Sequence, residues 1–124
     1  MIAQIFGAAF GLLAVILGAF GAHALKKKFT VEQQQSFETG VRYQMYHAIV
    51  LLLFGHIVDA STELVQVTTI LFILGTILFS FSIYGLCLSS AFGKKLRFLG
   101  PVTPLGGLLL VGAWFLLLYQ VVIS

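Results

Sequence analysis

The stretch "IAQIFGAAFGLLAVILGAFGAHAL", Ile2 to Leu25, holds no lysine, arginine, aspartate or glutamate. It is longer than the ~20 apolar residues that an α-helix needs to cross a ~30 Å hydrocarbon core. Three further apolar runs follow, at 41–58, 64–90 and 102–123. Together the four runs occupy most of the chain, so we expect a single transmembrane domain over residues 1–124.

The composition places this domain in a membrane. The chain is 60% hydrophobic and 9% charged, whereas soluble domains carry about 25% charged residues. Four runs of helical length predict an all-α fold, an integral membrane four-helix bundle. The first run has no positive charge before it and "KKK" directly after it, which is the reverse of a cleaved signal peptide. We therefore expect it to be a retained helix.

The basic residues predict the orientation. The connection between the second and third runs, Asp59–Glu63, has no lysine or arginine. All seven basic residues fall in or near the first and third connections: Lys26, Lys27, Lys28, Arg42, Lys94, Lys95 and Arg97. Short loops rich in lysine and arginine stay in the cytoplasm. The pattern predicts a multi-pass protein of the cytoplasmic membrane with both termini on the extracytoplasmic side.

Between the first two runs lies a mildly amphipathic segment, at about 29–38. Thr30 followed by Glu32 and Gln33 is typical of an N-cap and a first helical turn. We expect a short helix that lies along the cytoplasmic membrane surface.

Small residues form a stripe on one face of the first run, and the fourth run has a similar glycine. Such residues let helix backbones approach closely, which drives helix association in lipid. We favour this packing role over a glycine-lined path, within one chain or between copies in a homo-oligomer. The packing candidates are Gly7, Gly11, Gly18, Gly21 and Gly106.

Polar side chains from several segments are expected at the same depth near the cytoplasmic end. The candidate site consists of His23, Arg42, Tyr43, His47 and Thr103, with Arg42, Tyr43 and His47 in the first turns of the second helix. Four interpretations stay open. They are an interhelical hydrogen-bond cluster, a site for an anionic lipid headgroup or small anion, a proton-relay or transport site, and a metal site. Two histidines without a nearby carboxylate or thiolate are few ligands for a metal, so no metal or other cofactor is expected.

The function that these patterns favour is membrane support through lipid contact, with membrane lipids as partners and anionic headgroups among them. The alternative is a channel or transporter for a small solute, ion or proton. No nucleophile–base pair or phosphate-binding glycine loop is present in the sequence, so we do not expect an enzyme. The basic residues lie at helix ends, where they indicate topology and not nucleic-acid binding.

Three motifs point to a family. "GAFGAHALKKK", "FETGVRYQMYHA" and "GPVTPLGG", in this order and spacing, resemble the small bacterial membrane proteins grouped as "domain of unknown function 423", also designated UPF0382. The resemblance covers essentially the whole chain. It implies four helices in the cytoplasmic membrane and no established activity. Its pattern falls on Gly18, Gly21, His23, Gly40, Arg42, Tyr43, His47, Gly100, Pro101, Thr103, Pro104 and Gly106.

Overall fold

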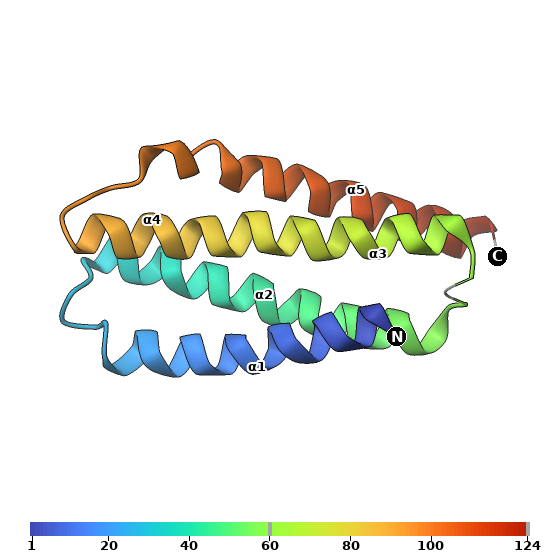
Figure 1. The fold of residues 1–124 in the computed structure, drawn as a ribbon, viewed down its shortest axis with the longest axis horizontal. Helices are drawn as coiled ribbons and strands as arrows, with labels where there is room; N and C mark the ends of the chain where they lie inside the picture. The colour runs from blue at the N-terminus through green and yellow to red at the C-terminus, as the bar shows by residue number, and fades with distance from the viewer. Residues whose placement is uncertain (60, 124) are drawn as a thin grey trace.

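The computed structural model describes residues 1–59 and 61–123 (Figure 1). Its elements are α1 (Ile2–His23), α2 (Val31–Ile57), α3 (Glu63–Thr76), the π-helical segment η1 (Ile77–Phe81), α4 (Ser82–Ala91), the short 3-10 helix η2 (Arg97–Leu99) and α5 (Val102–Ile123). The described residues contain helices and no strand, so the all-α expectation is confirmed. Ala60, in the expected turn, and Ser124, at the end of the expected domain, lie outside the described residues.

The expected break between an amphipathic segment at 29–38 and a helix from residue 41 is wrong. α2 runs without interruption from Val31 to Ile57. Thr30 begins it with a capping box, in which its hydroxyl accepts from the Gln33 backbone and the Gln33 side chain accepts from the Thr30 backbone. Gly40 lies inside this helix and against the Tyr84 ring, where an added side chain would collide. The polar turns and the apolar turns therefore belong to one helix.

The third expected helix, 64–90, is observed as the continuous stretch α3–η1–α4 with a π-helical segment at its middle. A π-turn adds one residue to the helical repeat and shifts the faces that follow it. The stretch ends at Ala91, and Gly93, two residues later, has a φ of 90°, in the left-handed region that glycine adopts without strain. The chain then reverses into η2 and α5.

The helices pack as an open array (Figure 1). α1 packs along α2, and the α3–η1–α4 stretch lies between α2 and α5. Among the described residues, no Cα atom of α5 comes within 8 Å of a Cα atom of α1 or α2. One hydrophobic core, around Leu51 and Phe72, joins α1, α2, α3 and α5. A second, around Phe37 and Tyr84, joins α2 to α4.

The two lysine-rich connections, 24–30 and 92–101, lie at one end of this array, which we call the basic end. The Lys28 ammonium lies 5.5 Å from the centre of the Phe92 ring and so links the two connections. The start of α1 and the end of α5 lie toward the opposite end (Figure 1).

Within residues 1–59 and 61–123, three helical stretches are long and apolar enough to cross a membrane. They are Ile2–His23, Glu63–Ala91 and Arg97–Ile123. α2 differs from them because a polar first half precedes its apolar second half.

Candidate functional site

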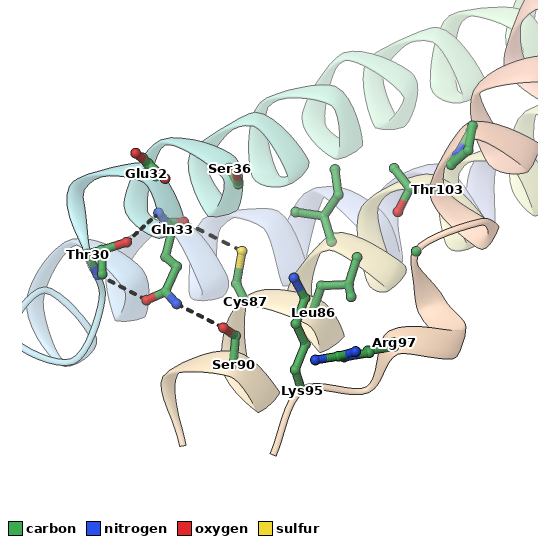
Figure 2. Close-up of a pocket in the computed structure, with 13 residues that line it drawn as sticks. Thr30, Glu32, Gln33, Ser36, Leu86, Cys87, Ser90, Lys95, Arg97 and Thr103 are labelled. Carbon is green, nitrogen blue, oxygen red and sulfur yellow. Dashed lines mark hydrogen bonds between the residues drawn. The ribbon is translucent and has the colours of Figure 1, made fainter. Parts of the chain in front are cut away.

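A groove of about 860 Å³ opens at the basic end, between the first turns of α2, the last turns of α4 and the start of α5 (Figure 2). Small-molecule sites commonly have volumes of about 300–1,000 Å³. Apolar side chains of Ile83, Leu86 and Pro104 form part of its lining. The rest of the lining is largely polar. It includes the charged or hydroxyl-bearing residues Glu32, Ser36, Ser90, Lys95, Arg97 and Thr103.

Gln33 joins the α2 wall of the groove to the α4 wall. Beyond its role in the capping box, its Nε2 donates to the Ser90 hydroxyl at 3.1 Å. The Cys87 thiol donates to the backbone carbonyl of the same glutamine at 3.5 Å. Figure 2 shows both contacts. They fix the separation of two walls that come from segments far apart in the sequence.

The remaining wall comes from the connection between α4 and α5. The Ser89 hydroxyl accepts from the Leu96 backbone N–H at 3.1 Å, which ties this connection to the end of α4. Lys95 and Arg97, on either side of Leu96, then line the groove beside Leu86 (Figure 2).

The groove carries a net positive charge. Its lining contains two cations, Lys95 and Arg97, and one carboxylate, Glu32. All three side chains are exposed, and in the part of the chain that the structure describes neither cation is ion-paired with a carboxylate. A guanidinium and an ammonium free of carboxylate partners are the groups that bind phosphate in proteins.

Thr103 lines the groove from the start of α5. α5 begins at Val102, so Thr103 lies in its first turn. Its hydroxyl is hydrogen-bonded to the Ser82 hydroxyl, which also donates to the Phe79 carbonyl at 2.9 Å. The pair attaches the start of α5 to the end of the π-helical segment.

Below the groove, a buried glutamine connects three helices. Gln44 is 0% exposed, its Nε2 donates to the Phe10 carbonyl of α1 at 2.8 Å, and its Oε1 accepts from the Tyr84 hydroxyl of α4 at 2.6 Å. Nearby, the Ser80 hydroxyl donates to the Gly40 carbonyl at 2.7 Å. Buried polar groups in a bilayer need such partners, because no water is available to replace them.

His47 is the second buried polar group of α2. Its Nε2 accepts from the Trp114 indole N–H at 3.1 Å, and its Nδ1 lies 2.7 Å from the Tyr43 carbonyl. An acceptor at Nε2 and a donor at Nδ1 assign the neutral tautomer with its proton on Nδ1, as inferred from the hydrogen-bond partners. His47 thus bridges α2 and α5.

The structure brings together only part of the predicted site. Tyr43 and His47 share a face of α2, with ring centres 6.5 Å apart. His23 is exposed at the end of α1, and Thr103 is on α5, none of whose described Cα atoms lies within 8 Å of a Cα atom of α1. Because α2 begins at Val31, Arg42 is exposed about 16 Å along the helix and not in its first turn.

Several functional candidates were missed by the sequence reasoning. Lys95 and Arg97 were visible in the sequence, but they served only as topology signals. Trp114 was not among the candidate site residues, and Gln44 lay within a quoted motif without being singled out. Only the folded arrangement shows that these side chains are joined or lie in one groove.

The glycine stripe of α1 faces α2. A side-chain carbon at Gly7 would lie 2.9 Å from a backbone carbonyl oxygen of α2, and one at Gly21 would overlap the Phe37 ring. At Gly11 and Gly18 the nearest atoms of α2 would be 3.8 and 3.4 Å away, which is ordinary contact. The stripe is therefore tight at its two ends and looser between them.

Gly106 lies where α5 approaches η1 closely. A Cβ there would overlap the backbone of Leu78 and Phe79 in the π-helical segment. α5 can lie this close to η1 only because position 106 has no side chain.

At the end opposite the groove, Asp59 forms a local turn. Its carboxylate accepts from the Ser61 backbone N–H at 2.9 Å, and this bond lowers the pKa of Asp59 from its ordinary value. Thr62 then caps α3 by accepting from Val65 N–H at 3.3 Å. These contacts describe an exposed turn.

The fold and the groove define a class of protein: a small helical membrane protein with a basic, partly polar groove at one end. The chain belongs to the family described as "Protein of unknown function (DUF423)", whose profile matches residues 17–107. The resemblance noted in the sequence is thereby confirmed.

Its relatives are named as membrane proteins. The chain is 39% identical to the UPF0382 membrane protein YwdK of Bacillus subtilis (strain 168) over 120 residues, 95% of this chain and 94% of the relative. It is 38% identical to the UPF0382 membrane protein SH2409 of Staphylococcus haemolyticus, over 92% and 89% of the two chains. With the UPF0382 inner membrane protein YgdD of Escherichia coli (strain K12) the identity is 36%, over 92% and 84%. No solved structure matches the chain. The protein is thus an integral protein of the cell membrane.

Proposed function

We propose that this protein supports the cytoplasmic membrane by holding an anionic lipid headgroup in the groove at its basic end. In this proposal the chain crosses the bilayer four times, with both termini outside and the groove at the cytoplasmic surface. The role is one of binding, without catalysis.

The distribution of charge supports this orientation. Six of the basic residues lie in the two connections of the basic end, and the positive-inside rule assigns such connections to the cytoplasm. α2 provides the fourth crossing, because it packs along α1 and turns back into α3.

The length of α2 supports a groove at headgroup level. Its 27 residues span about 40 Å at 1.5 Å per residue, whereas the hydrocarbon core is about 30 Å thick. About 10 Å of the helix therefore extends beyond the core. The polar turns that follow Thr30 suit this projecting part, and they form one wall of the groove.

The single observation that carries the proposal is the position of Lys95 and Arg97 beside the hydroxyl groups of a concave groove. Arginine and lysine bind phosphate through charge-assisted hydrogen bonds. Near an anionic membrane surface each such cation contributes about 1 kcal/mol of attraction. A phospholipid phosphate is the group of matching charge at this depth.

The hydrogen bonds inside the membrane favour this role over transport. Gln44 and His47 both hold partners on neighbouring helices, so they serve as interhelical links. A transporter would instead show saturable solute flux in liposomes. If the unaltered protein showed such flux and His47→Ala abolished it, the transport function would be supported and the lipid-binding proposal would be wrong.

The test is lipid binding by the purified protein. Lys95→Ala combined with Arg97→Ala should weaken retention of phosphatidylglycerol about 30-fold, which corresponds to two contributions of about 1 kcal/mol. Added salt should weaken the binding of the unaltered protein, because exposed charges are screened over about 8–10 Å. Native mass spectrometry and titration in detergent both measure this retention.

The matched control is Lys26→Ala combined with Lys27→Ala, two exposed basic residues of the other connection that do not line the groove. It should leave retention nearly unchanged. Equal losses in the two double variants would show that general surface charge, and not the groove, attracts the lipid.

A further inference from the structure

The polar side chains that line the groove fall into two sets. Each member of the first set is hydrogen-bonded within the protein: Thr30, Gln33, Cys87, Ser90 and Thr103. The second set consists of Glu32, Ser36, Lys95 and Arg97. Among the described residues, no side chain of the second set forms a hydrogen bond or an ion pair with another residue. The second set is therefore available to a ligand.

The second set is divided between two walls of the groove. Glu32 and Ser36 are four residues apart on α2, so their side chains share one face of that helix. Lys95 and Arg97 lie on the connection between α4 and α5 (Figure 2). The groove thus offers a carboxylate and a hydroxyl from one wall and two cations from another.

Each wall requires a different chemical group. Lys95 and Arg97 only donate hydrogen bonds, so they suit an anionic oxygen such as that of a phosphate. The Glu32 carboxylate only accepts hydrogen bonds, and its charge would repel a phosphate placed beside it. A ligand that bridges the two walls therefore carries a phosphate at one end and hydrogen-bond donors at the other.

The net charge of the lining distinguishes two kinds of donor. Two cations and one carboxylate leave the lining with one net positive charge. A phosphodiester whose headgroup ends in hydroxyl groups, as glycerol does, carries one negative charge and neutralises this lining. A headgroup that ends in an ammonium, as ethanolamine does, has no net charge and leaves the positive charge unbalanced. The lining therefore favours hydroxyl groups as the donors.

The position of Glu32 and Ser36 along α2 fits a headgroup. They are the second and sixth residues of the helix, so both lie within about 9 Å of its start. In the proposed orientation, about 10 Å of α2 extends beyond the hydrocarbon core. Both side chains are exposed. They therefore lie at the level of lipid headgroups and not among the acyl chains.

We propose that Glu32 and Ser36 determine which lipid the groove holds, by binding the free hydroxyl groups of a phosphodiester headgroup whose phosphate binds Lys95 and Arg97. This proposal rests on the proposed function and adds the chemistry of the headgroup. Hydroxyl groups of a glycerol head donate to the Glu32 carboxylate, and the Ser36 hydroxyl donates to or accepts from them. Hydrogen bonds to an ionised group are the stronger kind, so Glu32 contributes most of the selectivity.

Two lipids of equal charge test the proposal. Phosphatidylglycerol and phosphatidylmethanol share the same phosphodiester, but the methyl group of the second has no hydroxyl. With matched acyl chains, native mass spectrometry would measure how tightly the purified, unaltered protein retains each lipid. We expect about tenfold tighter retention of phosphatidylglycerol, the factor that one hydrogen bond to a charged group supplies. Equal retention would overturn the proposal, and so would a preference for phosphatidylethanolamine over phosphatidylglycerol.

Glu32→Ala removes the carboxylate and should abolish this preference. Retention of phosphatidylmethanol should be no weaker than in the unaltered protein, because the variant loses a negative charge, and this retention also shows that the groove is still formed. Glu32→Gln keeps an acceptor oxygen and should restore part of the preference. A preference that persists in Glu32→Ala would overturn the role of Glu32.

Glu38→Ala is the control for loss of charge on the same helix. Glu38 is exposed on α2, does not line the groove and accepts from the Gln34 amide at 3.3 Å. This variant should keep the preference for phosphatidylglycerol. If it lost the preference as fully as Glu32→Ala, the selectivity would come from the general charge of α2 and the proposal would be wrong.

Water-soluble glycerophosphoglycerol distinguishes a lipid from a solute as the source of the headgroup. It has the same head as phosphatidylglycerol but no acyl chains to hold it at the membrane. We expect it to displace phosphatidylglycerol only at a large molar excess. Displacement at equal concentration would show that the groove binds a solute, contrary to the proposal.

The outcomes separate this proposal from the proposed function. Suppose that retention of both lipids depends on Lys95 and Arg97 but the unaltered protein does not prefer phosphatidylglycerol. The headgroup site would then stand, and the selectivity would be refuted. If retention of neither lipid depends on Lys95 and Arg97, both proposals are refuted.

Discussion

Single polar side chains determine how the helices are held together. Gln44 has no exposed surface and joins α1 to α4 through two hydrogen bonds. Such bonds between membrane helices contribute about 0.6–2 kcal/mol each. The sequence placed His47 among the candidate site residues, and the structure shows it buried, as polar groups inside a membrane usually face protein. It did not reveal Trp114 as its partner, because that pairing depends on a contact between residues 67 positions apart.

Tyr84→Phe tests the value of one of these bonds. It removes the hydroxyl that donates to Gln44 and leaves the ring in place. We expect the free energy of unfolding in detergent to fall by about 1 kcal/mol, measured by denaturant titration. Tyr46→Phe, on an exposed ring of α2, should leave stability unchanged. A similar stability for both variants and the unaltered protein would contradict the structural role of Gln44.

At the scale of elements, apolar runs located the helices but not their continuity. The apolar run 64–90 did not reveal η1. A π-turn adds one residue to the helical repeat, and in a helix that is apolar on every face this leaves the hydrophobic pattern unchanged. The second helix was expected to begin after Gly40. The capping box at Thr30 instead begins it at Val31, ten residues before the expected start at residue 41. Gly40 lies inside the helix, packed against the Tyr84 ring.

Gly106→Ala tests the contact between α5 and η1. The added methyl would overlap backbone that cannot turn aside, so we expect a loss of about 1–3 kcal/mol in the free energy of unfolding. Gly11→Ala is the control: its methyl meets an ordinary contact, and alanine favours helix by up to about 1 kcal/mol. Gly11→Ala should be neutral or stabilising. If Gly106→Ala were equally well tolerated, α5 would not lie against η1 as described.

For the whole molecule, composition and run length were sufficient to predict a helical membrane protein. The order of the helices was not predictable, since it depends on which faces pack, and the four runs are too uniformly apolar to distinguish those faces. The groove was missed for the same reason. Its walls come from α2, α4 and the connection before α5, and only their packing brings Lys95 and Arg97 opposite Ser36.

The central claim is that the chain crosses the membrane four times with its basic end and groove in the cytoplasm. Cysteine labelling in intact cells tests it most directly, in a Cys87→Ser background that has no other cysteine. Ser61→Cys, in the turn after α2, should react with a membrane-impermeant maleimide added outside. Lys27→Cys, in the basic connection, should react only after the cells are permeabilised. Labelling of residue 27 in intact cells, or protection of residue 61, would contradict the account.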